Sequence, residues 1–325
     1  MRIGAFVVHY RFWPDVRGTL DALLEQTRPP DDVLVVDDRS DDGSVDAIRA
    51  AYPAVDVLEA PRNRGVIANF QAGIDAMLAR GADAIFILTH ETLLEPDALE
   101  VLARRLEEDP RVGEVAPLIG WLSRPDVVFS AGGALLSRTW ENPHNGMYEP
   151  LARWRGRGPQ RRPWVDGACV LLRAEAVRQA GPLEVRYHHY YDDVHLGVRL
   201  NQLGWRVECH CDAVAYQQPG ELAEYYRVRN RLGWLRATAP RRVFNRALAG
   251  YARRFVADLR EEPALAVAIA RGVRDFALGR WGPAPERYEA ARRVHEPSIG
   301  GAIDLVPDPP AAEPPVAALA TSDAE

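Results

Sequence analysis

The chain has 325 residues, 47% of them hydrophobic, and a formal net charge of −6. This is ample for one large α/β domain plus helical additions. Three cysteines (Cys169, Cys209 and Cys211) make no disulfide framework, and no apolar run reaches membrane-spanning length. A disulfide-stabilised secreted protein and an integral membrane protein are therefore excluded, and with no signal peptide visible in the first residues we expect a cytoplasmic protein.

The first third of the chain alternates between strand and helix patterns. In chain order we predict a strand at 3–9, a helix at 15–27, a strand at 32–36, a helix at 45–51, a strand at 55–58, a helix at 68–79, a strand at 84–88 and a helix at 96–106. Such spacing indicates an α/β fold with a doubly wound, mostly parallel sheet. Ligands of these sheets bind beyond the carboxyl ends of the strands.

The rest of the chain is less regular. Residues 124–162 are rich in Gly, Arg, Trp and Pro, which favours a long lid or an acceptor-binding loop. Residues 221–294 have helical spacing, and the tail from residue 297 has six prolines, five acids and no arginine. We therefore predict a catalytic domain at 1–220, a helical region at 221–295 and a disordered tail at 296–325.

Charge is unevenly distributed. Residues 221–295 contain 16 Arg against 8 Asp plus Glu, whereas the remainder contains 24 Arg against 38 Asp plus Glu. A basic helical section suits an anionic membrane face or an anionic acceptor, and it equally suits arginines on solvated helix faces. No nucleic-acid-binding module is present, so nucleic acid is not an expected partner.

Polar clusters follow the second and third predicted strands. In "VVDDRSDDGS", Asp37 and Asp38 end an apolar run, where carboxylates can accept hydrogen bonds from a pyrimidine base and from ribose hydroxyls. A turn that caps the next helix is the competing interpretation. In "APRNRGVIANF", Arg62 and Arg64 can meet phosphate, and Gly65 permits close backbone approach.

Two further clusters contain acids. "THET" places His90 and Glu91 just after the fourth strand, where enzymes acting on nucleoside diphosphates place metal-binding carboxylates. In "YHHYYDDVHLGVRL", Asp192 and Asp193 lie among aromatic residues at a helix start, a setting that raises the basicity of an acid. A helix N-cap explains the pair equally simply. The "CHC" at 209–211 alternates as a buried strand does, which predicts core packing.

Taken together, these motifs resemble the inverting family 2 glycosyltransferases of the GT-A fold, and in particular their bacterial rhamnosyltransferase-like branch. The resemblance extends from Ile3 to about Pro283 and also includes "VDGACVLLRAEAVRQAGPL", "DAVAYQQ", "YYRVRNRL" and "RGVRDFALGRWG". It implies a Rossmann-like GT-A domain with a C-terminal helical extension. It also implies a dTDP- or UDP-sugar donor and a glycan, lipid-linked or small-molecule acceptor.

The resemblance assigns roles to individual positions. It makes Asp193 the catalytic base, with Asp192 beside it, and Glu91 the metal-binding acid. The nucleotide-sugar contacts it implies are Tyr10, Asp37, Asp38, Arg62, Asn63, Gly65, Asn69, His90 and Gly167. This chain departs from the family pattern at two positions, because Gln217 replaces a histidine and His195 replaces an acid.

These departures leave two interpretations of how the leaving group is stabilised. In the first, Glu91, His90 and Gln217 hold Mg²⁺ or Mn²⁺ while the diphosphate supplies further oxygen ligands. In the second, an arginine clamp from Arg155, Arg157, Arg161 or Arg162 replaces the metal. A non-catalytic nucleotide-sugar-binding homologue is the alternative function. We expect a cytoplasmic hexosyltransferase with a peripheral contact to the inner membrane face.

Overall fold

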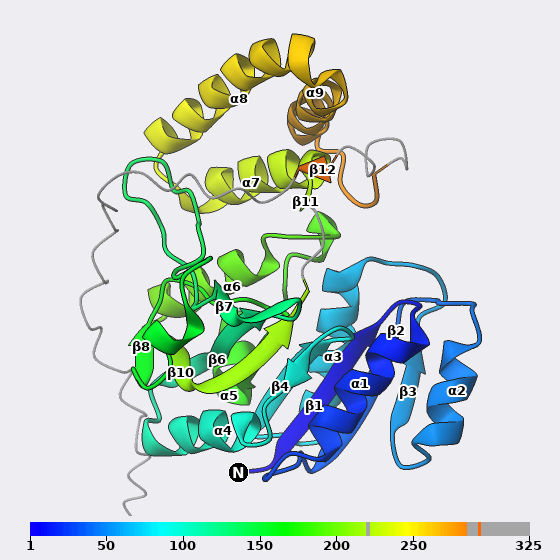
Figure 1. Ribbon diagram of the computed structural model, residues 1–325. Coiled ribbons are helices and arrows are strands. Elements are labelled where there is room, and N and C mark those ends of the chain that lie inside the picture. Colours follow the sequence, from blue (N-terminus) through cyan, green and yellow to red (C-terminus); the bar gives the residue numbers. More distant parts are fainter. Residues whose placement is uncertain (219–221, 285–291, 294–325) are drawn as a thin grey trace, which may run out of the picture.

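The computed structural model describes residues 1–218, 222–284 and 292–293 (Figure 1). The predicted disordered tail lies outside this range. The first third folds as β1 (Ile3–His9), α1 (Trp13–Leu24), β2 (Asp32–Asp37), α2 (Ser44–Ala51), β3 (Asp56–Glu59), α3 (Val66–Ala79), β4 (Ala84–Thr89), β5 (Leu93–Leu94) and α4 (Ala98–Glu108). The predicted alternation is confirmed, with small shifts at the boundaries. For example, α1 begins at Trp13 because Pro14 occupies its first turn, where proline costs no hydrogen bond.

The second part of the chain contains more strand than the sequence indicated. Its elements are β6 (Val112–Trp121), β7 (Arg124–Ser130), η1 (Leu151–Arg153), β8 (Pro159–Arg161), β9 (Cys169–Arg173), α5 (Ala174–Ala180), η2 (Val185–Tyr187), α6 (Asp192–Gln202) and β10 (Arg206–Gln217). The prediction of an irregular loop at 124–162 is therefore wrong at both ends, because β7 pairs with β6 and β8 pairs with β10.

The strands form one sheet in the order β3-β2-β1-β4-β9-β6-β10-β5, with β7 and β8 attached at its side. Strands β3, β2, β1 and β4 are parallel neighbours, and β10 is parallel to β6. Strand β9 runs antiparallel between β4 and β6. The mostly parallel sheet is thus confirmed. The antiparallel β9 brings the residues that precede it to the edge at which the parallel strands end.

Helices cover both faces of the sheet. One face packs against α1, α2 and α4 through residues such as Leu20, Ile48 and Leu102. The other packs against α3, α5 and α6 through residues such as Ile74, Val177 and Leu200. Both predicted core cysteines of the "CHC" sequence, Cys209 and Cys211, belong to this second cluster.

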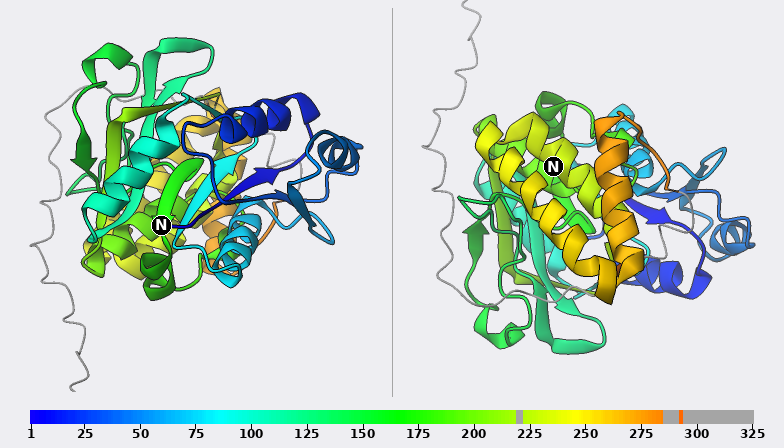
Figure 2. Two further views of the ribbon diagram at one scale, coloured as in Figure 1. Left: turned by 90° about the horizontal axis from the view of Figure 1, so that it is seen from below. Right: turned by 90° about the horizontal axis from the view of Figure 1, so that it is seen from above.

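The C-terminal part consists of β11 (Leu222–Ala223), α7 (Glu224–Thr238), α8 (Arg241–Glu261), α9 (Pro263–Ala277) and β12 (Arg292–Arg293), which pairs with β11. The prediction of helices throughout 221–294 is therefore wrong for the β11–β12 pair. Figures 1 and 2 show α7, α8 and α9 stacked above the edge at which the parallel strands end. Within the described part of the chain, no helix has both the length and the apolar character needed to cross a bilayer.

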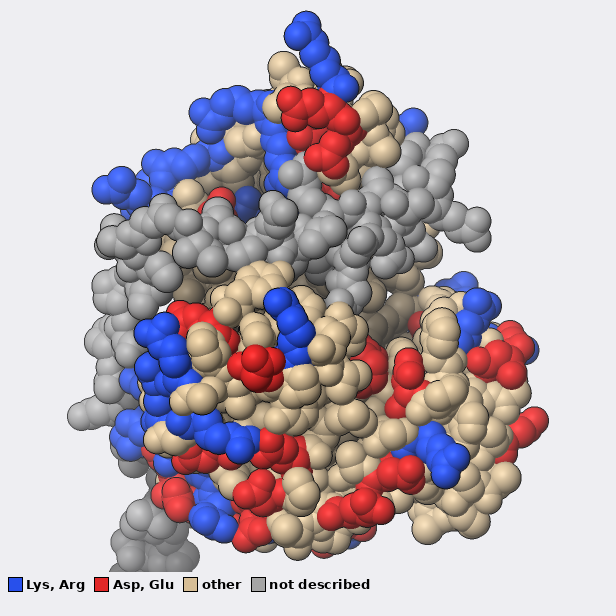
Figure 3. All heavy atoms as spheres, viewed as in Figure 1, with Lys and Arg blue, Asp and Glu red and all other residues tan. Residues whose placement is uncertain are grey.

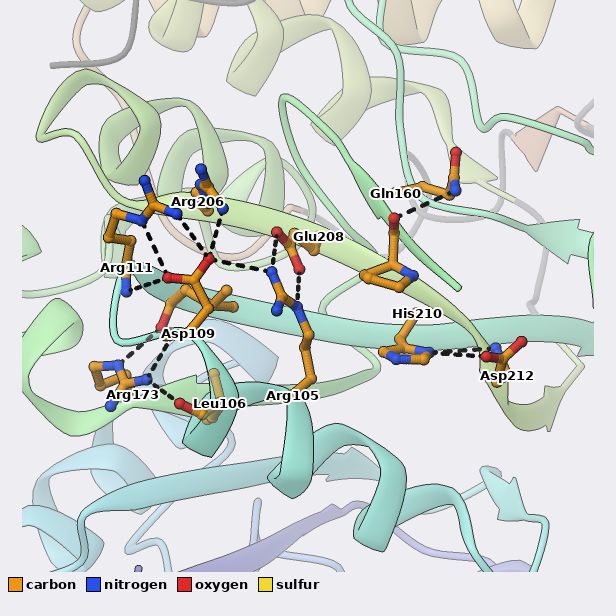
Figure 4. Close-up of polar contacts among 12 residues, drawn as sticks. Arg105, Leu106, Asp109, Arg111, Gln160, Arg173, Arg206, Glu208, His210 and Asp212 are labelled. Atoms are coloured by element: carbon orange, nitrogen blue, oxygen red, sulfur yellow. Dashed lines mark hydrogen bonds and ion pairs between the residues drawn. The ribbon is translucent and has the colours of Figure 1, made fainter. Parts of the chain in front are cut away.

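An ion-pair cluster fixes α4 to the sheet at the opposite edge (Figure 4). Asp109 follows α4 and accepts hydrogen bonds from Arg111 and from Arg206, the latter at 2.5 Å. Arg105 of α4 contacts both Asp109 and Glu208 of β10, its Nε lying 2.6 Å from Glu208. These partners lower the pKa of Asp109 to about 2 despite its burial, chiefly through hydrogen bonds from Arg111. The cluster is structural, because it lies at the amino ends of β6 and β10.

Candidate active site

The carboxyl edge of the sheet brings together the polar clusters identified in the sequence. Strands β1, β2, β4 and β10 end there at His9, Asp37, Thr89 and Gln217. Strand β9 starts there, because Cys169 lies opposite Leu88 and the Thr89 N–H donates to the carbonyl of Ala168. Segments that are up to two hundred residues apart in sequence therefore share one edge.

The two predicted nucleotide-binding aspartates are buried and already hydrogen-bonded. Asp37 is 1% exposed and accepts hydrogen bonds from the main-chain N–H and the hydroxyl of Ser40. Asp38 is 4% exposed and accepts from the N–H groups of Arg64, at 2.7 Å, and Gly65, at 3.0 Å. Asp37 thus shapes the turn after β2, and Asp38 joins this turn to the loop before α3. Direct contact with a nucleotide stays a prediction for both.

The loop before α3 is held by protein contacts as well. Asn69 is buried, donates to the Gly65 carbonyl at 3.2 Å and accepts from Arg64 at 2.8 Å. Gly65 has a φ of +84°, and a side chain there would collide with the ring of His188. The close approach predicted for Gly65 is therefore made by His188, which precedes α6. This contact joins the loop before α3 to the segment before α6.

The remaining predicted donor contacts lie around this loop. Arg62 and Asn63 are exposed, and Tyr10, after β1, lies with its ring under the Arg11 guanidinium at 4.9 Å. The ring of His90 packs edge-on against His9, with their centroids 5.7 Å apart. Burial lowers the pKa of His9 to about 4, so its imidazole is neutral at physiological pH.

The structure places the three predicted metal ligands together. Gln217 Nε2 donates to Glu91 Oε1 at 3.2 Å, although 126 positions separate the two residues. Glu91 Oε2 is buried, has no hydrogen-bond partner within the described part of the chain, and lies 3.5 Å from His90 Nδ1. A carboxylate oxygen of this kind suits a hard divalent cation. Among the described residues, however, no group of three or more His, Cys, Asp or Glu could hold a metal ion. Any metal here would need oxygen ligands from the substrate.

The arginines of the alternative clamp have partners within the protein. Segment 158–162 runs along β10 at 207–211, where Arg161 lies opposite Glu208 and the Arg162 N–H donates to the Val207 carbonyl. This part of β10 is several residues before Gln217. Arg157 directly precedes the segment and stacks on Trp154, and Arg155 forms an ion pair with Glu95. Glu95 also accepts a hydrogen bond from Tyr216, the neighbour of Gln217. The arginine clamp therefore stays a prediction.

The predicted catalytic pair lies at the start of α6 in a cluster of acids. Burial, and then the charges of Asp192 and Asp166, raise the pKa of Asp193 well above that of an ordinary aspartate. Burial raises the pKa of Asp192 to about 6, and it does the same for Asp166, which precedes β9. Gly167 lies against this pair, because a Cβ there would be 3.2 Å from the Cβ of Asp193. The Gly167 N–H also forms a hydrogen bond that favours the ionised form of Asp193.

The loop that precedes the pair is strained and held by α7. His188, Tyr190 and Tyr191 all have φ between 67° and 70°, a conformation that is unfavourable for side chains of this size. Asn230 is fully buried and donates to the carbonyls of Tyr187, at 3.0 Å, and His189, at 2.5 Å. Arg229, also fully buried, donates to the Tyr187 carbonyl at 2.8 Å.

Sequence reasoning missed three residues of this site. Asp166, Arg229 and Asn230 fell within the motifs "VDGACV" and "YYRVRNRL", but no role was assigned to them. The signal that was available is the Arg-Asn pair itself, in a helix that is buried over most of its length, and it does not indicate which groups the two residues contact. His195 stands where the family pattern has an acid. Its ring stacks on that of Tyr187, with the centroids 6.1 Å apart, so it packs against the loop that precedes α6.

Comparison with known proteins agrees with this arrangement. A family model described as "Glycosyl transferase family 2" matches residues 5–131, and a second model, "Glycosyl transferase family group 2", matches residues 84–257. An N-acetylglucosaminyl-diphospho-decaprenol L-rhamnosyltransferase of Mycobacterium tuberculosis is 28% identical over 218 residues, which are 61% of this chain and 70% of the relative. The O-antigen biosynthesis protein RfbC of Myxococcus xanthus is 30% identical over 217 residues, 63% of this chain but only 16% of that protein.

Solved structures support the same fold at low sequence identity. The mannosyltransferase PcManGT of Pyrobaculum calidifontis, in complex with GDP-Man and Mn²⁺, aligns with a TM-score of 0.55 and 17% identity, over 86% of this chain and 88% of that one. GalNAc-T7, with UDP, GalNAc and Mn²⁺, aligns with a TM-score of 0.57 and 14% identity over 73% of this chain. The alignment spans 48% of the GalNAc-T7 chain. The chain therefore belongs to the family 2 glycosyltransferases and is a glycosyltransferase with a GT-A fold.

Proposed function

We propose that this glycosyltransferase moves a hexose from a nucleoside-diphosphate sugar to an acceptor hydroxyl with inversion at the anomeric carbon. The observation that carries the proposal is the position of Asp193, a partly buried acid of raised pKa beside Gly167 on the carboxyl edge of the sheet. A rhamnosyl donor such as dTDP-rhamnose is favoured because the curated relative from Mycobacterium is named a rhamnosyltransferase. A UDP-hexose is the second candidate donor.

In this mechanism Asp193 is the general base. The acceptor hydroxyl attacks the anomeric carbon, its proton passes to the Asp193 carboxylate, and the bond from that carbon to the diphosphate oxygen breaks. A base works best when its pKa is near the working pH, and burial among Asp192 and Asp166 moves the pKa of Asp193 in that direction. One displacement at one carbon inverts its configuration.

Glu91, with Gln217 and His90 beside it, would hold a divalent ion at the diphosphate. The unpartnered Glu91 Oε2 supports this assignment, as do two solved structures of the fold that contain Mn²⁺ with a nucleotide or nucleotide sugar. When bound, Mg²⁺ or Mn²⁺ offsets the negative charge that develops on the leaving diphosphate. Because this site offers few protein ligands, we expect weaker metal binding than in a site with two or more carboxylates.

A lipid-linked acceptor is favoured by two observations. The Mycobacterium relative is named for a diphospho-decaprenol acceptor. In addition, α8 exposes apolar residues (Leu248, Val256 and Leu259) between exposed arginines, and Figure 3 shows basic side chains gathered along this helix. Such a surface suits a peripheral contact with an anionic membrane, which would place the protein at the inner membrane face. A glycan or a small-molecule acceptor is the alternative.

A donor and acceptor screen tests the proposal. The purified protein is incubated with dTDP-rhamnose or UDP-hexoses and with a diphosphate-lipid-linked sugar, a free glycan or a small-molecule alcohol. Nucleoside diphosphate release identifies the donor, and proton NMR of the product gives its anomeric configuration. We expect release to depend on the acceptor and the product to have the configuration opposite to the donor. A product with retained configuration would overturn the single-displacement mechanism.

A further inference from the structure

A second buried acid lies behind the catalytic pair. Glu114 is the third residue of β6 and is 1% exposed, with Leu172 of β9 and Val207 of β10 as its neighbours across the sheet. Its side chain is on the sheet face that α3, α5 and α6 cover, where the surrounding core is apolar. Its Oε2 atom has no hydrogen-bond partner among the described residues. A polar group buried in this way destabilises the fold unless it has a function or a partner.

Glu114 and the catalytic pair line the same small cavity. The cavity has a volume of about 20 Å³, and its lining includes Glu114, Asp192, Asp193 and Gly167. The other lining residues are apolar, among them Phe70, Ile87 and Leu196. A cavity needs about 10–15 Å³ to hold one water molecule, so this one has room for a single water between the carboxyl groups.

The protonation state of Glu114 follows from its surroundings. Burial, and then the nearby charge of Asp193, raise the pKa of Glu114 well above that of an ordinary glutamate. The titratable groups that act on Asp193 are Asp192 on α6 and Asp166 before β9, both of which are also acids. Asp193 is partly exposed and accepts a hydrogen bond from the Val194 N–H at 2.7 Å, which favours its ionised form, whereas Glu114 is 1% exposed in apolar surroundings. Of the two acids, Glu114 is therefore the one expected to stay neutral, and a neutral acid has an O–H group to donate.

We propose that Glu114 is a positioning residue, which donates a hydrogen bond toward the Asp193 carboxylate through the one water for which the cavity has room. This inference rests on the proposed role of Asp193 as the base. The hydrogen bond stabilises the ionised carboxylate and fixes its orientation from behind, leaving the other side of Asp193 for the acceptor. It also explains why an acid is tolerated at a buried position of an otherwise apolar strand.

The test compares Glu114→Leu with Glu114→Gln. Leucine fits the apolar surroundings but cannot donate, whereas the glutamine amide keeps a donor at the same position. Because Asp193 must be ionised, kcat/KM falls as the pH drops through the pKa of Asp193. We expect Glu114→Leu to move this acidic limb upward by about one pH unit, a tenfold loss of kcat/KM on the limb, and Glu114→Gln to stay close to the wild type.

Glu208→Gln is the matched control. Glu208 is also a buried glutamate, on the adjacent strand, but it lies on the opposite face of the sheet and pairs with Arg105. This control should lower stability without moving the acidic limb. An unchanged limb in a folded Glu114→Leu protein would overturn the inference, as would a downward shift, which would mean that Glu114 is ionised. An acidic limb that moves as far in Glu114→Gln as in Glu114→Leu would also overturn the inference.

Carboxyl ¹³C NMR of the wild-type protein gives a readout that needs no Glu114 variant. The carboxyl signal of Asp193 is identified by its loss in Asp193→Asn, and its chemical shift should change with pH as the group ionises. Over the same pH range the chemical shift of Glu114 should stay at the value of a protonated carboxyl group. Ionisation of Glu114 before Asp193 would overturn the inference. Failure of the proposed function is distinguishable, because in that case Asp193→Asn itself would remain active.

Discussion

Removal of the Asn230 side chain should release the catalytic loop. His188, Tyr190 and Tyr191 have positive φ angles, and such sparsely populated backbones cost about 1–3 kcal/mol each in a residue other than glycine, or about 3–9 kcal/mol together. Asn230→Ala removes one of the two donors to the Tyr187 carbonyl, which keeps Arg229, and removes the Asn230 donor from the His189 carbonyl, at about 1–3 kcal/mol. The stabilisation lost is thus comparable with the strain of at least one of the three residues. The relaxed loop should become populated, with Asp193 displaced from its position.

The expected result is a fall in kcat of about 10- to 100-fold, because a displacement of about 1 Å in a catalytic group costs on that order. Donor KM should change less, since the turn of Asp37 and Asp38 does not depend on Asn230. Steady-state nucleoside diphosphate release measures both constants, and Asn245→Ala, at an exposed position of α8, is the matched control. A folded Asn230→Ala protein with kcat within threefold of the wild type would refute this reasoning.

Three further predictions concern nucleotide, metal and pH. Asp38→Ala should weaken nucleoside diphosphate binding at least tenfold in calorimetry, because a hydrogen bond to a charged group contributes about 1.5–3 kcal/mol; unchanged affinity would leave Asp38 with only its turn. Activity should fall in EDTA, return with Mn²⁺ or Mg²⁺ and be lost in Glu91→Gln, while His90→Ala should change which ion restores it; full turnover in excess chelator would exclude the metal site. Asp109→Asn should destabilise the protein by about 2 kcal/mol near neutral pH, because partners lower the pKa of Asp109 to about 2 and this stability is present above pH 4 and lost as the pH falls toward 2. Chemical denaturation at several pH values would show this difference shrinking in acid, and a difference independent of pH would contradict it.

The regular elements of the first third could be predicted because each has a local pattern. Strand β1 is a continuous apolar run buried along its whole length, and α1 repeats Val16, Leu20 and Leu23 on one face. Strands β7 and β8 could not be predicted in this way. They are short, and they exist because β6 and β10 offer unpaired edges, which depends on the tertiary arrangement.

The residues of the site also divide into those that a local motif indicates and those that depend on tertiary contacts. Resemblance of motifs indicated Glu91 and Gln217, and the structure places them 3.2 Å apart. The parts played by Asn230 and Glu114 depend on contacts between distant segments, a main-chain carbonyl in one case and a shared cavity in the other. No residue pattern within a single segment reports such contacts.

Asp193→Asn tests the central claim most directly. The amide keeps the shape of the side chain but cannot accept the acceptor proton, and a positioned base contributes about 10²–10⁴-fold. Single-turnover transfer should therefore fall by at least a hundredfold, while nucleoside diphosphate affinity in calorimetry stays within about twofold of the wild type. Asp212→Asn, at an exposed acid of β10, should transfer normally. Transfer by Asp193→Asn at close to the wild-type rate, with saturating acceptor, would contradict the account.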